Sequence, residues 1–134
     1  MSEKMNSRFQ RKNRNRFGAT TVEFAFVLPV ILIMFLGAIE ITRLNFCRQT
    51  ALNAAYEGAR ACVVPGATTA DGQAEAMRLL TAVRAHRGAS VNINMQQSIV
   101  NVTITIPISQ NSWGVGRFAT NANIVRNFSL KREM

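Results

Sequence analysis

The sequence is poor in the residues from which metal sites and disulfide scaffolds are built. Its 134 residues include two cysteines, one histidine and seven Asp+Glu, too few for a zinc-finger ligand set or a disulfide-dense fold. Charged residues make up 17% of the chain, against roughly 25% in ordinary soluble domains. Because 48% of the chain is hydrophobic, extensive disorder is disfavoured, and part of this apolar material requires a solvent other than water. No metal ligands and no cofactors are predicted.

Catalytic motifs are missing as well. The sequence contains no H-E-x-x-H motif, and its glycines form neither a phosphate-binding loop nor a dinucleotide fingerprint. The single histidine, His86, has no neighbouring acid or cysteine to orient it, so we expect it on the surface. The prediction is a protein that is not an enzyme, with no catalytic residues and no small-molecule substrate.

Positive charge is concentrated in a short N-terminal leader. Residues 1–18 carry six basic side chains and one acidic side chain, a net charge of +5, which is more than half of the chain's total of +9. A nucleic-acid-binding protein would need its basic residues on the folded part, so nucleic acid is not an expected partner. The leader is rich in Asn and Arg, and this composition predicts a disordered, solvated, cytoplasmic segment.

A long uncharged run follows the leader. Residues 24–39 read FAFVLPVILIMFLGAI, with Glu23 before them and Glu40 after them. A helix of this length covers about 24 Å, and the addition of residues 19–22 brings it close to the thickness of a bilayer core. We therefore predict a membrane-spanning helix over 19–40, anchored by residues such as Phe24, Pro29 and Leu36. The alternative is a buried core helix, although the rest of the chain offers little to cover so apolar a helix on all sides.

The residues at the start of this helix resemble a family. A glycine after a basic leader, a glutamate five residues later and an apolar helix resemble the processing site of type IV prepilins. The longer run GATTVEFAFVLPVILIMFLGAIEITR is similar to TadE-like pseudopilins of the Tad/Flp branch. The matching residues are Gly18, Ala19, Glu23, Phe24, Pro29, Gly37, Glu40 and Arg43.

The resemblance implies a function. A prepilin peptidase would cut between Gly18 and Ala19, and Glu23 would neutralise the N-terminal amine of a neighbouring subunit. The expected protein is a minor pseudopilin that supports assembly of an adhesive Tad/Flp pilus, with the peptidase and other pilus subunits as partners. The basic leader predicts a cytoplasmic N-terminus in the bacterial inner membrane and a periplasmic or extracellular C-terminal portion.

One competing interpretation is disfavoured, and two alternatives stay open. A secretory signal peptide fits poorly, because Leu36 stands where signal peptidase requires a small residue before a cut after Ala38. An uncleaved single-pass protein with a periplasmic domain would have the same span. A component of the Tad secretion apparatus would be processed without entering the filament.

Residues 41–134 are predicted to form an exported α+β domain of the type IV pilin kind. The long helix continues to about Val64 and stops at Pro65-Gly66. Its expected core face consists of Leu52, Tyr56, Ala59 and Val63, beside Ala55 and Cys62. We expect an antiparallel sheet packed on this helix. The other elements expected are a helix over 71–86 and strands over 91–95, 100–106 and 124–131.

Several single residues carry narrower expectations. Alanines 51, 55 and 59 are expected to pack within the chain, although their spacing also permits close contact between helices. Cys47 and Cys62 lie too far apart on one helix to form a disulfide, so we expect buried free thiols, with pairing between subunits as the alternative. Arg78, Arg84 and Arg87 are expected on a solvated surface, with a partner-binding patch as the alternative. Residues 109–123 read as an exposed loop that Trp113 anchors to the core, with a binding role for Trp113 as the alternative.

Overall fold

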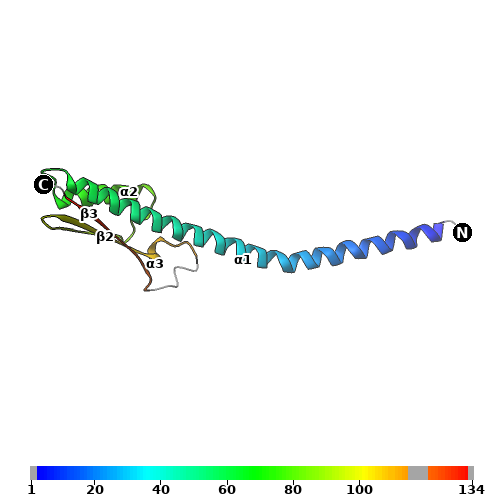
Figure 1. Cartoon of the computed structure of the whole chain (residues 1–134). Coiled ribbons are helices and arrows are strands. Elements are labelled where there is room, and N and C mark those ends of the chain that lie inside the picture. Colours follow the sequence, from blue (N-terminus) through cyan, green and yellow to red (C-terminus); the bar gives the residue numbers. More distant parts are fainter. Residues whose placement is uncertain (1–2, 115–120, 133–134) are drawn as a thin grey trace. The chain divides into compact units, whose positions relative to one another are not determined.

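The structure is a computed structural model that describes residues 3–114 and 121–132, with side chains from Gly18 onward. It divides into two compact units, Met1–Ala38 and Ile39–Met134. The elements in chain order are α1 (Glu3–Val63), α2 (Thr69–Ala82), β1 (Ser90–Met95), β2 (Ile99–Pro107), α3 (Ile108–Asn111) and β3 (Asn123–Lys131) (Figure 1).

Helix α1 begins earlier than expected and ends where expected. Its backbone is helical from Glu3, so the prediction of a disordered leader is wrong. The leader contains neither proline nor glycine before Gly18, and its Arg, Lys, Gln and Met residues have good helix propensity. The helix continues through Pro29 and ends at Val63, just before the left-handed Gly66 with its φ of 85°.

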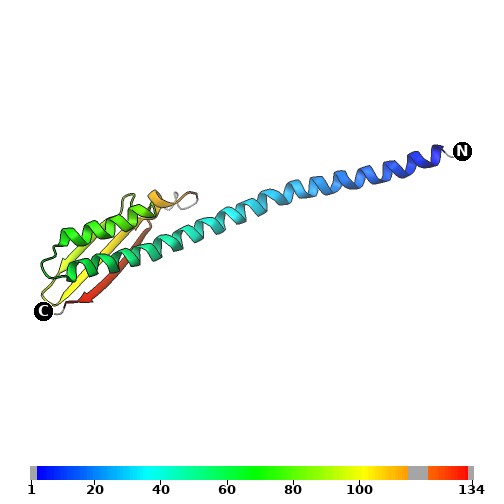
Figure 2. The same ribbon diagram turned by 90° about the horizontal axis from the view of Figure 1, so that it is seen from above.

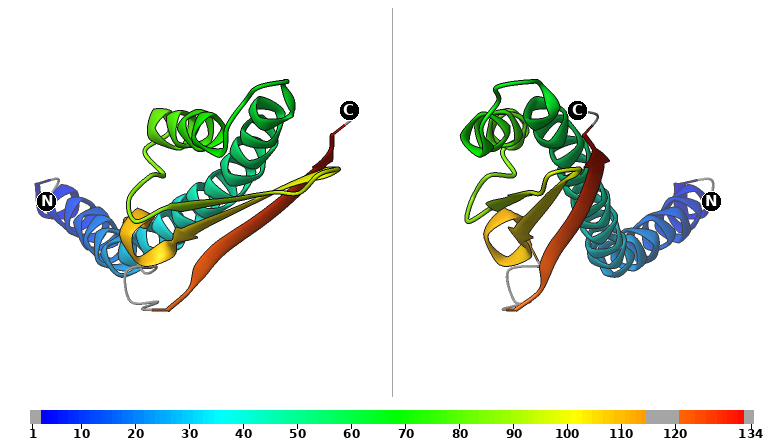
Figure 3. Two further views of the ribbon diagram at one scale, coloured as in Figure 1. Left: turned by 90° about the vertical axis from the view of Figure 1, so that its left-hand side faces the viewer. Right: turned by 60° about the vertical axis from the view of Figure 1, so that its left-hand side comes forward.

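The three strands form one antiparallel sheet in the order β1-β2-β3. The central strand β2 places Val102 opposite Ile93 on one side and opposite Phe128 on the other. Alternate residues of β2 are fully buried, namely Val100, Val102, Ile104 and Ile106. Helix α2 and the C-terminal part of α1 cover the same face of the sheet (Figures 2 and 3). The expected α+β architecture, a long helix packed on a small antiparallel sheet, is therefore confirmed.

The face that α1 presents to this domain is built from small residues. Ala51, Ala55 and Ala59 have no exposed surface, so the prediction that they pack within the chain is confirmed. By contrast, Leu52 and Tyr56 are 39% and 43% exposed, and the expectation that they form the core face is wrong. Small side chains allow the sheet and α2 to approach the axis of α1 closely. The larger residues Leu52 and Tyr56 then lie at the edge of this contact, where they are partly exposed. There the Tyr56 ring packs edge-to-face on Phe128, with ring centroids 5.3 Å apart.

Helix α2 ends four residues before the predicted His86. Arg84 adopts a left-handed conformation with a φ of 57°. Its N–H donates to the carbonyl oxygen of Thr81, and the Ala85 N–H donates to that of Leu80. These two bonds form a Schellman motif, which usually requires glycine at the left-handed position. The sequence signal failed here because arginine occupies this position, while the first glycine stands at residue 88.

Candidate membrane anchor, processing segment and juxtamembrane clamp

The apolar segment of α1 is exposed within the chain. Phe24 and Leu36 are 61% and 63% exposed. Only 6% of the most apolar 18-residue stretch of the helix is buried. A core helix of a soluble protein would be mostly buried, so this alternative fails for the described residues. Pro29 lies inside the helix without interrupting it. The described residues include one helix that is both long enough and apolar enough to cross a membrane, as expected for a membrane-anchored protein.

The predicted cleavage residues lie on an accessible stretch of the same helix. Gly18 and Ala19 are both exposed, and a Cβ built on Gly18 would have no heavy atom within 4 Å. Packing therefore imposes no requirement for glycine at this position. A glycine in a helix interior lowers helix stability by about 1 kcal/mol relative to alanine, so the helix is locally weak at Gly18.

Glu23 lies one turn beyond Ala19 on α1, on the same side of the helix. Its side chain is exposed, and within the described part of the chain it has no hydrogen-bond or ion-pair partner. Gly18, Ala19 and Glu23 thus lie within two turns of one helix, immediately before the apolar segment. The carboxylate is available to a group outside the described residues.

A second cluster follows the apolar segment and lies within the C-terminal unit. The Arg43 Nε donates a 2.8 Å hydrogen bond to the carbonyl oxygen of Asn111. One turn earlier, Glu40 Oε2 accepts a 3.3 Å hydrogen bond from the backbone N–H of Trp113. The Arg43 guanidinium carbon also lies 6.0 Å from the centroid of the Trp113 ring, within the range of a cation–π contact. We call these contacts the juxtamembrane clamp, because Glu40 and Arg43 hold the end of α3 against α1.

Asn111 is the buried centre of this clamp. It is 3% exposed, and its Nδ2 donates to the carbonyl oxygens of Arg87 and Pro107 at 2.8 and 2.9 Å. An asparagine amide has two donor hydrogens, which here satisfy one carbonyl after α2 and one at the end of β2. Asn111 therefore joins three segments that are distant in the sequence.

The clamp corrects two expectations from the sequence. Residues 109–123 do not form a wholly exposed loop, because α3 occupies part of this range and both Asn111 and Ser112 are buried. Trp113 does not anchor the core, since 80% of it is exposed. Residues 115–120 of the expected loop lie outside the described residues. The three-residue spacing of Glu40 and Arg43, which places both side chains on one face of a helix, is the signal that could have indicated the clamp.

The remaining candidate residues behave as buried or solvated side chains. Cys47 and Cys62 are free and buried, and burial raises the pKa of each thiol. His86 is exposed, as expected. Arg78 pairs with Glu75 through an Nη2–Oε1 contact of 2.6 Å. In the described part of the chain, no three His, Cys, Asp or Glu side chains are grouped so that they could hold a metal ion.

Comparison with known proteins supports the resemblance drawn from the sequence. The model of the family described as TadE-like protein matches residues 18–60. Comparison with curated proteins and with solved structures gave no significant match. The matched range contains the expected processing residues, the whole apolar segment and both helical residues of the clamp. Residues 18–60 are therefore similar to TadE-like proteins, and the same range holds the part of the described chain that is long and apolar enough to cross a membrane.

Proposed function

We propose that the chain is a minor pseudopilin precursor that a prepilin peptidase cleaves after Gly18, and that its product supports assembly of a Tad/Flp adhesive pilus. The observation that carries this proposal is the position of Gly18. It is exposed, has free space around its α-carbon, and lies within α1 six residues before Phe24, where the apolar segment that the chain leaves uncovered begins. Cleavage there would release the basic leader and create a new amine on Ala19.

A helical peptide must unwind locally before a protease can bind it in an extended form. Glycine at residue 18 makes this unwinding easier, because it contributes less to helix stability than any residue except proline. The absence of a Cβ also permits close approach of the peptidase to the scissile bond. The Gly18 requirement thus follows from recognition by the peptidase rather than from the packing of this chain.

Glu23 has the proposed role of pairing with the Ala19 amine of a neighbouring subunit. A carboxylate beside an apolar segment is costly in a membrane unless it is paired or protonated. An amine from another processed subunit supplies the missing positive charge, and the pair would fix the register between subunits. The span would be oriented with the leader in the cytoplasm, since basic residues flank the cytoplasmic ends of membrane helices.

The decisive test is the N-terminal residue and intact mass of the protein from its native membranes. Cleavage predicts an N-terminus at Ala19 in the parent and an uncut precursor in Gly18→Arg. Gly37→Ala is the matched control, because Gly37 is a glycine of the same helix with no atom within 4 Å of a built Cβ, and it should be cut normally. A full-length parent would reject the pseudopilin in favour of an uncleaved, membrane-anchored periplasmic protein.

A processed protein still has two possible destinations. The proposed pseudopilin should be present in sheared pili. A Tad secretion-apparatus component would be cut at the same bond and remain in the membrane fraction. Neither role requires an enzymatic activity, a cofactor or a nucleic acid, and we propose none.

A further inference from the structure

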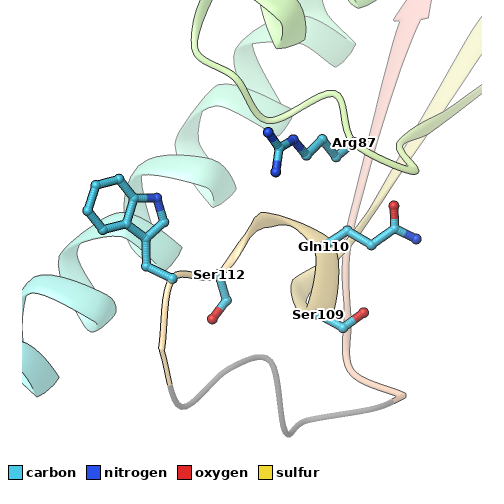
Figure 4. A pocket seen from close by; sticks show the side chains of 5 residues that line it. Arg87, Ser109, Gln110 and Ser112 are labelled. Atoms are coloured by element: carbon cyan, nitrogen blue, oxygen red, sulfur yellow. The ribbon is translucent and has the colours of Figure 1, made fainter.

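Three arginines from two segments line one cavity of the C-terminal unit. The cavity has a volume of about 290 Å³, and its charged residues are Arg43 on α1 and Arg84 and Arg87 after α2. None of the described residues that line it is acidic. Its other walls come from the end of α3 and from Trp113. Figure 4 shows an adjoining hollow, with Arg87 on the segment after α2 and with Ser109, Gln110 and Ser112 on or just after α3.

The cavity lies close to the end of the apolar segment along the chain. Arg43 follows Ile39, the last residue of the apolar run, by four residues. At 1.5 Å per residue this separation is about 6 Å along the helix axis. The headgroup layer on each side of a bilayer core is roughly 5–8 Å thick. A helix whose apolar run ends at the core boundary therefore places Arg43 among the headgroups.

Trp113 lies at the same depth along the axis of α1 as Arg43, because its backbone contacts Glu40 and its ring lies near Arg43. It is the only tryptophan in the chain, and it is 80% exposed. A large exposed aromatic ring is unfavourable in water, whereas tryptophan is enriched at the membrane interface. The exposure of Trp113 is thus explained by a lipid environment better than by an aqueous one.

Buried polar atoms complete the lining. Ser112 and Asn111 both line the cavity and are 8% and 3% exposed. Ser112 Oγ and Asn111 Oδ1 have no hydrogen-bond partner within the described residues. A hydroxyl can donate to a phosphate oxygen, and an amide oxygen can accept from a headgroup hydroxyl. Arginine binds phosphate strongly through its planar set of N–H donors.

We propose that this cavity binds the headgroup of an anionic phospholipid, with Arg84 and Arg87 on the phosphate and Trp113 inserted at the interface. The glycerol hydroxyls of phosphatidylglycerol match the unpartnered oxygen of Asn111. This inference rests on the membrane anchorage proposed above, but it does not require cleavage at Gly18. The bound headgroup holds the C-terminal unit at the membrane surface.

The test uses the full-length chain in nanodiscs, with Trp113 fluorescence as the direct reporter. Discs of phosphatidylcholine are compared with discs that also contain phosphatidylglycerol. We expect a more blue-shifted emission and stronger quenching by brominated lipid in the anionic discs than in the phosphatidylcholine discs. The double variant Arg84→Gln/Arg87→Gln should need a higher anionic lipid content for the same shift, by about fivefold for each arginine removed. The matched control is Arg126→Gln/Lys131→Gln, which removes the same charge from exposed positions on β3 and should behave as the parent.

Three outcomes overturn the proposal. The first is an emission that is independent of the anionic lipid. The second is an equal loss in the control variant, which would indicate general charge attraction. The third is a shift produced by inorganic phosphate in detergent but by no lipid, which would indicate a soluble phosphate ligand. Retention of the chain in the discs is measured separately, so a failure of membrane anchorage is distinguished from a failure of headgroup binding.

Discussion

Arg43 and Asn111 are 68 residues apart in the sequence and are joined by a 2.8 Å hydrogen bond from the Arg43 Nε to the Asn111 carbonyl oxygen. The bond connects the membrane-proximal part of α1 in the C-terminal unit to the segment between β2 and β3. Asn111 in turn binds the carbonyl oxygens of Arg87 and Pro107. The Arg43 side chain thus holds Asn111 in place, and Asn111 connects the segment after α2 to the end of β2. Asn111 and the segment after α2 both line the proposed headgroup cavity.

Replacement of Arg43 tests this support. Arg43→Gln removes a partly buried, charge-assisted hydrogen bond, which contributes about 1.5–3 kcal/mol to the free energy of unfolding. Chemical denaturation followed by circular dichroism measures the loss, and Trp113 emission should change in the folded variant as its cation–π partner disappears. Arg48→Gln is the control, because Arg48 is exposed and its contact with Asn45 is long at 3.4 Å. Equal stability of the two variants would contradict a supporting role for Arg43.

The crossing of α1 and α2 gives a second prediction, on glycine packing. A Cβ on Gly72 would lie 2.6 Å from the carbonyl oxygen of Gly58 and would also clash with the Cys62 Sγ. Gly72→Ala should therefore reduce the free energy of unfolding by about 1–3 kcal/mol, the usual cost of overpacking.

Gly58 offers a graded comparison for this prediction. Its built Cβ meets the Gly72 carbonyl oxygen at 3.1 Å, a tight contact that a small shift relieves. Gly58→Ala should be less destabilising than Gly72→Ala, and Gly114→Ala, with its nearest atom at 4.0 Å, should cost least. Denaturant midpoints of the three variants measure this order, and a reversed order would mean that the helices separate easily.

The sequence predicts much of this fold, because periodicity reflects which side of an element is buried. The alternation of apolar and polar residues in β2 matches its buried face residue by residue, and the unbroken apolar run predicts the membrane helix. The helix face was harder to predict. Alanine, glycine and cysteine carry a weak hydrophobic signal, so Leu52 and Tyr56 dominate the pattern although the smaller residues make the contact.

The partners of the clamp could not be predicted, for a different reason. The spacing of Glu40 and Arg43 places both side chains on one helix face, but their partners are the backbone N–H of residue 113 and the carbonyl oxygen of residue 111. Backbone groups have no signature in the sequence. The exposure of Trp113 differs from the expectation for a similar reason. A lone tryptophan in a polar segment usually packs inward, but the contact of Trp113 with Glu40 uses its backbone N–H, and 80% of the residue is exposed.

Arg84 gives a prediction in the opposite direction, toward higher stability. Its φ of 57° lies in the left-handed region, which costs a residue with a Cβ roughly 1–2 kcal/mol. Arg84→Gly removes this cost, and we expect the free energy of unfolding to rise by about 1 kcal/mol. Arg84→Gln is the control, since glutamine loses the charge but keeps the Cβ. A gain of similar size in both variants would mean that the arginine charge, and not the backbone conformation, limits stability.

The N-terminus of α2 predicts a pH-dependent contribution to stability. Asp71 Oδ2 accepts 2.8 Å hydrogen bonds from both the backbone N–H and the hydroxyl of Thr68, as expected for residues that cap a helix. The backbone bond is the larger cause, and the two bonds together lower the pKa of the Asp71 carboxyl below its ordinary value. Protons therefore bind the unfolded chain more readily than the folded chain. The stabilisation is fully present above the unfolded pKa of about 3.9 and is lost as the pH falls through the lower folded pKa.

Two variants separate the charge from the cap. Asp71→Asn should be less stable than the parent at neutral pH, and the difference should shrink as the pH falls below about 4, the ordinary value for aspartate. Thr68→Ala should cost about 1 kcal/mol at neutral pH, the usual value for loss of an N-cap side chain. The stability difference between Thr68→Ala and the parent should shrink less in acid than the difference for Asp71→Asn, because the backbone N–H of residue 68 still donates to Asp71 in this variant. Thermal unfolding across this pH range measures both effects, and a constant deficit for Asp71→Asn would show that the ionised carboxylate does not stabilise the start of α2.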